Sequence, residues 1–195
     1  PEIKWCLNDR AAMYPDFRRQ TQLVHDVISA KLGIPNRQVA FGTPQSTGCW
    51  IQHNMRMDHP CQQCAAWVHY LNSPILVEYN EQLMYSDWRT TLGHELGHGI
   101  AGIHEQYDDA QFKSHIRTYG YWATNGTSVS NKGDPTVMDF GSNGLPGFPE
   151  GVWEWQPWDV ARACDVNDHE KVRFVACGTV EPTQDEWGAC EAVPV

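Results

Sequence analysis

The sequence predicts an α+β fold, and three observations support this prediction. A long amphipathic helix comes first, short strands rich in β-branched and aromatic residues follow it, and a second helix ends near residue 99. The rest of the 195-residue chain is Gly-rich and irregular, apart from one short helix and a cysteine-containing tail. At this length we expect one domain, in which a regular front half and a loop-built back half enclose a cleft.

The stretch from Asp16 to Leu32 predicts the first helix. Its apolar residues recur near helical spacing, and they are Phe17, Leu23, Val24, Val27, Ile28 and Leu32. Gly33 follows directly and Pro35 lies just beyond it, which is typical of the end of a helix. The helix is therefore expected to be amphipathic.

Short strands are predicted after this helix. Each segment is rich in β-branched or aromatic residues, and Gly, Pro or Asn separates it from the next. The predicted strands cover residues 38–41, 50–52, 65–71 and 75–79. Together they predict one small sheet.

The segment WRTTLGHELGHG, residues 88–99, predicts the second helix. Ser86 or Asp87 is the expected N-cap, and Gly97 and Gly99 are expected to end the helix. Seven glycines lie between residues 120 and 151, which predicts irregular structure there. One more helix is predicted over residues 157–168.

The composition argues against two classes of function. The formal net charge is -10 and the 14 Lys and Arg residues are spread along the chain, so we expect no nucleic-acid partner. No apolar run reaches the length of about 18 residues that a membrane span needs, so we expect none. No feature of the sequence indicates an oligomeric state.

The seven cysteines indicate an oxidising compartment, because they are scattered and not gathered in one cluster. They are Cys6, Cys49, Cys61, Cys64, Cys164, Cys177 and Cys190. Their spacing predicts one disulfide between Cys164 and Cys177, and another between Cys49 and either Cys61 or Cys64. The odd count leaves one thiol unpaired or paired with another molecule. The protein is therefore expected to be secreted, or to lie in another oxidising extracytoplasmic compartment.

A structural zinc site is an alternative for residues 49–64. Two residues separate Cys61 from Cys64, and His53 and His59 lie nearby, a spacing that zinc ligands also use. Disulfides are favoured over this alternative in an oxidising compartment. A thioredoxin-type redox role is not indicated, because no βαβ pattern places Cys61 at the start of a helix.

The segment HELGHGIAGIH, residues 94–104, predicts a catalytic metal site. Four-residue spacing on a helix brings His94 and His98 to one face, where both imidazoles can reach a single ion. Glu95 lies roughly 100° further round the helix and can reach a bound water without being a ligand. We expect the third nitrogen from His104, once the chain has left the helix. Three histidines leave a tetrahedral zinc with one open position, which is the catalytic pattern.

This segment resembles the extended zinc signature of the metzincin clan of metallopeptidases. The next residues, EQYDD at 105–109, are similar to the continuation found in astacins. The segment DPTVMDFG, residues 134–141, resembles the methionine-containing turn of the clan, which implies that Met138 packs below the metal ligands without binding the ion. WQPWDVA, residues 155–161, resembles the start of the clan's C-terminal helix.

The resemblance implies a two-lobed zinc peptidase formed by a single catalytic domain, residues 1–195. Its upper lobe would cover about residues 1–104, with a small mixed sheet, a helix that backs it and the active-site helix. Its irregular lower lobe would cover about residues 105–195 and contain one helix. The implied activity is zinc-dependent endopeptidase action on a protein or peptide. One zinc lowers the pKa of its bound water towards about 7, and Glu95 is then the general base for attack on the peptide carbonyl.

Two residues differ from the family pattern. Ala101 stands where the clan has a turn glycine, so Gly99 or Gly102 is expected to adopt the left-handed conformation instead. Phe140 stands where astacins have a tyrosine that acts as an extra metal ligand and transition-state donor, and phenylalanine can do neither. The alternative function is therefore a catalytically silent metal-binding scaffold or binding module on a metalloprotease fold. The intact Glu95 argues against it, because a structural zinc does not need that carboxylate.

Two further groups of residues have weaker functional support. A tryptophan cluster is interpreted as core and interface packing in preference to a substrate platform. Its members are Trp153, Trp155 and Trp158. Carboxylates that could bind calcium match no defined loop spacing, so one zinc is the cofactor that the sequence supports. These carboxylates are Asp108, Asp109, Asp134, Asp165 and Asp168.

Overall fold

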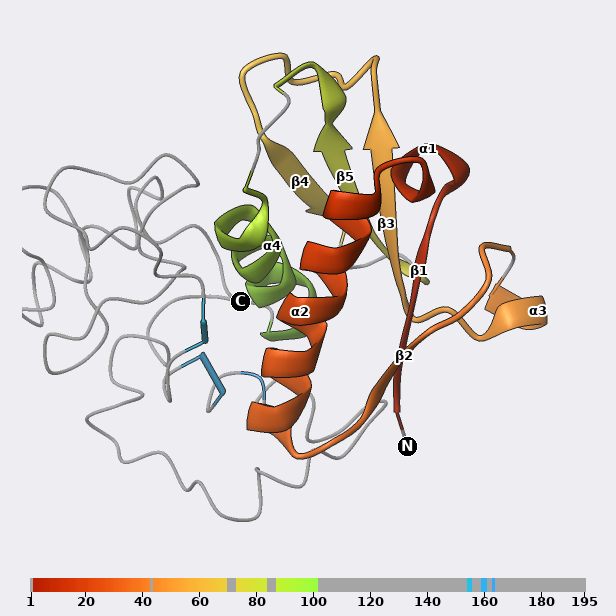
Figure 1. Ribbon diagram of the computed structural model, residues 1–195, viewed down its shortest axis with the longest axis vertical. Helices are drawn as coiled ribbons and strands as arrows, with labels where there is room; N and C mark the ends of the chain where they lie inside the picture. The colour runs from red at the N-terminus through yellow and green to blue at the C-terminus, as the bar shows by residue number, and fades with distance from the viewer. Residues whose placement is uncertain are drawn as a thin grey trace, which may run out of the picture.

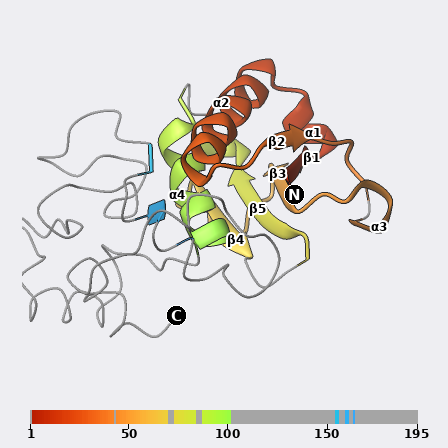
Figure 2. The same ribbon diagram turned by 90° about the horizontal axis from the view of Figure 1, so that it is seen from below.

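The computed structural model describes residues 2–42, 44–69, 73–83, 87–101, 154–155, 159–160 and 163. These residues form one five-stranded sheet with two long helices, α2 and α4, side by side on one of its faces (Figure 1 and Figure 2). The α+β class predicted from the sequence is confirmed for this part of the chain. No helix in these residues is both long enough and apolar enough to cross a membrane.

The sheet is mixed, with the strand order β2-β1-β3-β5-β4. Its strands are β1 Ile3–Leu7, β2 Asn36–Gln38, β3 Ile51–Arg56, β4 Ala66–His69 and β5 Ile75–Asn80. The pairs β1 with β2, β1 with β3 and β3 with β5 are parallel, whereas β4 runs antiparallel to β5 at the edge of the sheet. Three short helical segments complete the described elements: α1 Asp9–Ala12, α3 Pro44–Thr47 and the 3-10 turn Glu81–Leu83.

Two of the predicted strands are confirmed, and two differ from their predicted bounds. β5 and β4 lie within or close to the predicted segments. β3 continues to Arg56 instead of ending at residue 52, because it pairs with β5 along its whole length. β2 lies at Asn36–Gln38 and not at 38–41, since its position is set by pairing with β1, where Ile3 faces Asn36 and Trp5 faces Gln38.

β1 was not predicted from the sequence, although it lies inside the sheet between β2 and β3. Its segment IKWCL shows no alternation of polar and apolar residues, and Trp5, Cys6 and Leu7 are all buried. A parallel strand that is covered on both faces loses the period-2 pattern that identifies a half-buried strand. The Trp5 indole Nε1 donates to Asn36 Oδ1 over 2.9 Å, which ties β1 to β2 through a side chain as well.

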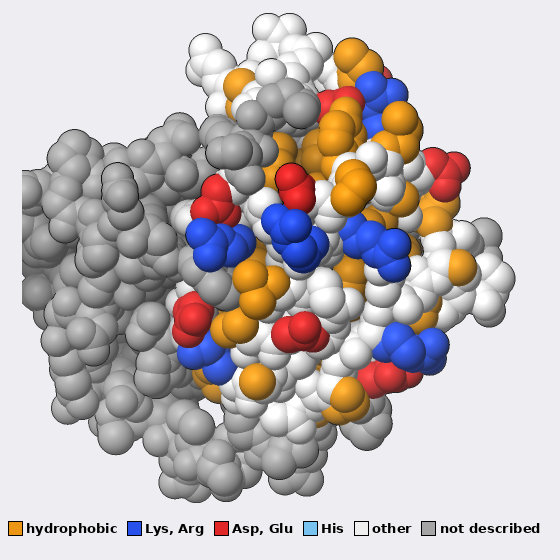
Figure 3. Space-filling view, viewed as in Figure 1, with side chains coloured by type: hydrophobic (Ala, Val, Ile, Leu, Met, Phe, Trp, Pro, Cys, Tyr) orange, Lys and Arg blue, Asp and Glu red, His pale blue; other side chains and the backbone are white. Residues whose placement is uncertain are grey.

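The first predicted helix is confirmed as α2, Pro15–Leu32. Pro15 occupies its first position, and Gly33 ends it in the left-handed conformation with a φ of 70°. Phe17 and Ile28 are buried against the sheet as the apolar spacing predicts, whereas Leu23 is 41% exposed. The outer face of α2 is polar: Figure 3 shows basic and acidic side chains next to one another on this side of the molecule.

The second predicted helix is confirmed as α4, Arg89–Ala101, but the prediction that glycines end it is wrong. Gly97 and Gly99 lie inside the helix. A Cβ atom at Gly99 would lie 3.1 Å from Cγ2 of Ile75 and 3.5 Å from Cγ2 of Val68. Gly99 therefore lets the helix backbone approach β4 and β5 closely. The burial of this helix outweighs the cost of about 1 kcal/mol for each helical glycine.

The two ends of α4 test the predicted N-cap and the predicted left-handed glycine. Asp87 Oδ1 accepts a hydrogen bond of 3.0 Å from the backbone N–H of Arg89, so Asp87 stabilises the start of the helix although the helix begins two residues later. Ser86 lies outside the described residues. At the other end Ala101 is helical, so it forms no left-handed turn, and Gly99 does not form one either. Gly102 lies outside the described residues.

Two disulfides are present in the part of the chain that the structure describes, Cys6–Cys49 and Cys61–Cys64. The first corrects the predicted partner of Cys49, which is Cys6. The parallel register of β1 and β3 brings these two cysteines together with their Cα atoms 5.9 Å apart, and a missed β1 meant a missed partner. The predicted pair Cys164 and Cys177 lies outside the described residues. Two disulfides are compatible with an oxidising compartment.

Candidate metal centre

Helix α4 brings His94 and His98 together inside the protein. Their side chains are 3% and 8% exposed, and their Nε2 atoms lie 3.1 Å apart. The two rings meet edge to face, with an interplanar angle of 88°. This arrangement follows from the four-residue spacing, which places both side chains on one face of the helix about one turn apart.

The histidine pair fits two corners of a tetrahedral zinc site. Zinc-to-nitrogen distances of about 2.0–2.1 Å place two ligand nitrogens of a tetrahedron about 3.3 Å apart. The observed 3.1 Å between Nε2 of His94 and Nε2 of His98 is close to this value. The same distance also suits a hydrogen bond in which one of the two nitrogens carries the proton. The donor type and the geometry thus both suit a zinc ion.

The remaining predicted site residues divide into two groups. Glu95 is 6% exposed and lies on α4 beside His94. Among the described residues, no group of three or more His, Cys, Asp or Glu side chains gathers at metal-ligand distances. His104, Met138 and Phe140 lie outside the described residues.

Trp155 supports the helix at the position just before the first histidine. Its indole Nε1 donates a hydrogen bond of 3.0 Å to the carbonyl oxygen of Gly93, and its side chain is fully buried. This agrees with the interpretation of Trp155 as a packing residue. Trp153 and Trp158 lie outside the described residues. The contact holds the turn of α4 that carries His94 against a second segment of the chain.

A buried polar chain lies between α2 and the sheet, and it was not foreseen from the sequence. His25 Nε2 lies 2.9 Å from His53 Nε2, and His53 Nδ1 lies 2.8 Å from the hydroxyl of Tyr79. All three side chains are fully buried. The signal in the sequence is weak: His25 lies on the apolar face of a helix, and His53 lies on the buried side of a strand that was predicted too short.

Burial controls the protonation of His25, His53 and Tyr79. It lowers the pKa of His53 to about 3, and together with the neighbouring His53 it lowers the pKa of His25 well below the ordinary value. Both rings are therefore neutral near pH 7. Burial, and then the negative charge of Glu95, raises the pKa of Tyr79 well above its ordinary value, so its hydroxyl keeps its proton. Tyr79 thus couples the buried rings of His25 and His53 electrostatically to helix α4.

A second polar cluster fixes the edge strand beside α4. The buried carboxylate of Glu78 on β5 accepts hydrogen bonds from Arg56 Nη1 at 2.6 Å, Trp67 Nε1 at 3.0 Å and His69 Nε2 at 2.9 Å. Burial raises the pKa of Glu78, but these three bonds and the charge of Arg56 outweigh it and leave the pKa below the ordinary value. The ionised carboxylate therefore ties β3 and β4 to β5.

The alternative zinc site at residues 49–64 is not supported by the described residues. Cys61 and Cys64 are joined to each other in a disulfide, and Cys49 is joined to Cys6. His53 is bonded within the buried chain. Sulfur atoms that form a disulfide are not thiolates and do not act as zinc ligands.

The comparisons with known proteins add no family assignment. The chain matches no protein-family model, and no curated protein is significantly similar to it in sequence. The residues of the candidate site are therefore the basis of the proposed function.

Proposed function

We propose that the protein is a zinc-dependent endopeptidase with a metzincin-like, two-lobed catalytic domain. The observation that supports this best is the convergence of His94 Nε2 and His98 Nε2, 3.1 Å apart, on a buried helix that also carries Glu95. Two imidazoles and an adjacent carboxylate on one helix are the residue types that metal-assisted hydrolysis needs.

The order of the elements also supports the proposal. The long helix α2, the short strands and the active-site helix α4 follow one another as the resemblance implies. In the proposal, these elements form the upper lobe, about residues 1–104. Residues from about 105 to 195 would form the lower lobe of the same catalytic domain and contribute Met138 as packing below the ligands.

In this proposal the ring nitrogens of His94, His98 and His104 hold one zinc ion. When bound, zinc supplies a Lewis acid that polarises the scissile carbonyl and makes a water acidic near neutral pH. Glu95 would accept a proton from the attacking water and deliver it to the nitrogen of the leaving amine. His94, Glu95 and His98 are all buried, and their low exposure would keep bulk water away from this proton transfer.

Two residues behind the helix would support Glu95 and His94. Tyr79 stays protonated, so it places a neutral group and not a second anion near the Glu95 carboxylate. Trp155 holds the Gly93 carbonyl, which fixes the turn that carries His94. The proposed substrate is a protein or peptide, and two disulfides support action in a secreted or otherwise oxidising setting.

Metal content tests the first half of the proposal. Purified wild-type protein should contain about one zinc ion per chain by mass spectrometry, and the variants His98→Ala and His104→Ala should lose it. His69→Ala is the matched control, because this histidine lies on β4 and is bonded to Glu78, and it should keep its zinc. Zinc retained in both ligand variants would show that the metal binds elsewhere.

Cleavage of a broad set of protein substrates tests the second half. Glu95→Ala should keep its zinc and lose at least about a hundredfold in the rate of peptide hydrolysis, because it removes the general base. Full activity in this variant would contradict the mechanism. The second candidate, a catalytically silent metal-binding scaffold, is favoured by Phe140 in place of tyrosine. Zinc binding by wild-type protein that cleaves none of the substrates would support that candidate.

A further inference from the structure

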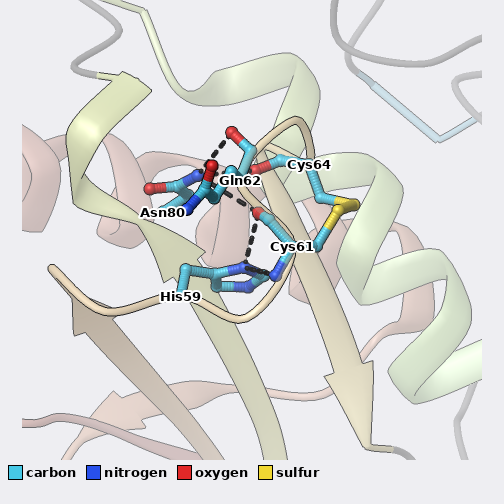
Figure 4. Close-up of a disulfide and its surroundings, with 5 residues drawn as sticks. All are labelled: His59, Cys61, Gln62, Cys64 and Asn80. Carbon is cyan, nitrogen blue, oxygen red and sulfur yellow. Dashed lines mark hydrogen bonds between the residues drawn. A yellow bond between two sulfur atoms is a disulfide. The ribbon is translucent and has the colours of Figure 1, made fainter.

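Cys61 and Cys64 close a very short loop at the surface, between β3 and β4 (Figure 4). They lie three residues apart in the sequence. Gln62 and Gln63 between them are exposed, and both cysteines are half-buried, so solvent and solutes reach this loop. Closing such a short loop removes little conformational freedom from the unfolded chain, so this disulfide constrains the fold only weakly.

Asn80 forms a second attachment of the same loop, which does not depend on the disulfide. Its side-chain Nδ2 lies 3.3 Å from the carbonyl oxygen of Cys61, 3.2 Å from that of Gln62 and 3.2 Å from that of Cys64 (Figure 4). Its backbone N–H donates to the carbonyl of Ala65 over 2.8 Å. Asn80 is 1% exposed and is the last residue of β5, so the sheet fixes the position of its side chain.

His59 anchors the start of the loop. Its Nδ1 lies 3.2 Å from the backbone nitrogen of Cys61 and 3.0 Å from the Cys61 carbonyl oxygen, so the ring can bond this residue in either tautomer. The ring is 4% exposed and packs against Trp67, with ring centroids 4.6 Å apart. Breaking the bond between the two sulfurs would therefore leave the loop attached at its start and along its length.

The other disulfide of the described residues has the opposite character. Cys6 and Cys49 are 0% and 3% exposed, and they lie 43 residues apart in the sequence. This bond joins β1 to the segment just before β3, inside the protein. A buried, long-range disulfide is structural, whereas an accessible one is typical of labile, regulatory or catalytic disulfides. The described residues thus include one disulfide of each kind.

We infer that Cys61–Cys64 is a site of thiol–disulfide exchange, and that its ligand is an external thiol. A thiolate RS⁻ attacks one of the two sulfurs, forms a mixed disulfide and releases the other cysteine as a thiolate. A second thiolate then attacks the sulfur of the bound RS group and leaves as RSSR. Two RSH molecules lose two electrons and two protons, and Cys61 and Cys64 gain them as two thiols. The loop supplies this site from a turn, without the helix of a thioredoxin, and independently of any peptidase activity.

Graded reduction of the oxidised full-length protein tests the inference. Samples at increasing dithiothreitol concentration are alkylated with iodoacetamide and mapped by peptide mass spectrometry, while far-UV circular dichroism reports the fold. Cys61 and Cys64 should be alkylated at reductant concentrations at least about tenfold lower than Cys6 and Cys49, with an unchanged spectrum. Reduction of both pairs together, or loss of the spectrum when Cys61 and Cys64 are reduced, would overturn the inference.

Paired double variants provide a second measurement. The variant with Cys61→Ala and Cys64→Ala should fold, and its melting temperature should fall by about half or less of the decrease caused by Cys6→Ala with Cys49→Ala. An equal or larger decrease would show that the short disulfide is a structural link and would refute an exchange role.

The source of the thiol is tested with the single variant Cys64→Ser, which leaves Cys61 as a thiol. It is incubated with oxidised glutathione or with a disulfide-linked cysteine peptide, and adducts are located by peptide mapping. A glutathione adduct at Cys61 supports a small thiol as the ligand. An adduct with the peptide alone supports a polypeptide thiol. The absence of both adducts at Cys61 would contradict the inference.

Discussion

The hydroxyl of Tyr79 lies 2.8 Å from Nδ1 of His53, and both side chains are fully buried. Through this contact β5 is joined to β3 and, by way of His25, to helix α2. Buried polar groups cost free energy unless they are bonded, and His25 Nδ1 has no hydrogen-bond partner among the described residues. The contacts among His25, His53 and Tyr79 therefore favour one arrangement of α2 on the sheet. They also make that arrangement sensitive to protonation of the two histidines.

The first prediction concerns the dependence of stability on pH. An unfolded histidine has a pKa of 6.5, whereas His53 in the folded protein has a pKa of about 3. Between these values the unfolded chain binds a proton that the folded chain does not. The neutral buried histidines thus make their full contribution to the free energy of unfolding above about pH 6.5. As the pH falls towards 3, the free energy of unfolding decreases by up to about 1.4 kcal/mol per pH unit for each such histidine.

Denaturant unfolding between pH 8 and pH 5 measures this slope. The double variant His25→Gln with His53→Gln keeps amide groups that can hydrogen-bond but removes both titrating rings. It should be less stable at pH 8 and should lose most of the slope between pH 6.5 and pH 5. Equal slopes in the variant and the wild type would show that other groups cause the acid sensitivity.

The second prediction concerns Tyr79→Phe. The substitution preserves the ring contacts with Phe17 and Trp88 but removes the hydroxyl that bonds His53. A buried nitrogen without its partner costs about 1–3 kcal/mol, so we expect a loss of that size in the free energy of unfolding. Tyr14→Phe is the matched control. Its hydroxyl bonds Glu81, which also accepts from Arg10, so the control should lose less. A larger loss in the control would contradict this assignment.

Local pattern was enough to predict part of the fold. α2 has its own periodicity and end signals, and β5 is a short run with flanking turn residues, so both follow from nearby sequence. β1 and the partner of Cys49 depend on pairing between segments far apart in the chain, and local pattern does not contain that information. The chosen bounds of β2 and β3 were wrong for the same reason.

In the candidate site, too, local sequence predicts some relationships between residues and not others. His94, Glu95 and His98 lie on one helix, so helix geometry alone predicts their relationship. The chain of His25, His53 and Tyr79 comes from a helix and two strands that meet only in the folded protein. Gly99 illustrates a further limit: a glycine in a helix reads as a stop signal, and its contact with the sheet is visible only in three dimensions.

The third prediction concerns Gly99→Ala. Helix propensity alone would stabilise α4 by about 1 kcal/mol. The new Cβ would lie 3.1 Å from Cγ2 of Ile75, so β5 or the helix must shift, and overpacking of this kind typically costs about 1–3 kcal/mol. We expect a net loss of stability in denaturant unfolding. In an Ile75→Ala background the obstructing methyl is absent, and Gly99→Ala should become neutral or stabilising. An additive double-mutant cycle would show that the two residues do not interact.

The fourth prediction concerns Trp155→Phe, and it connects the fold to the proposed metal centre. The substitution retains most of the buried ring but removes the indole N–H that donates to the carbonyl of Gly93. We expect a loss of about 0.5–1.5 kcal/mol in the free energy of unfolding, the usual contribution of one hydrogen bond. The turn of α4 before His94 should also become less fixed, so zinc affinity, measured by competition with a chelator, should fall by up to about tenfold. Trp67→Phe is the matched control, because its indole N–H donates to Glu78 of β5 and not to α4, so this variant should leave zinc affinity unchanged. If both variants bind zinc as the wild type does, Trp155 contributes to packing alone and does not position the metal-binding turn.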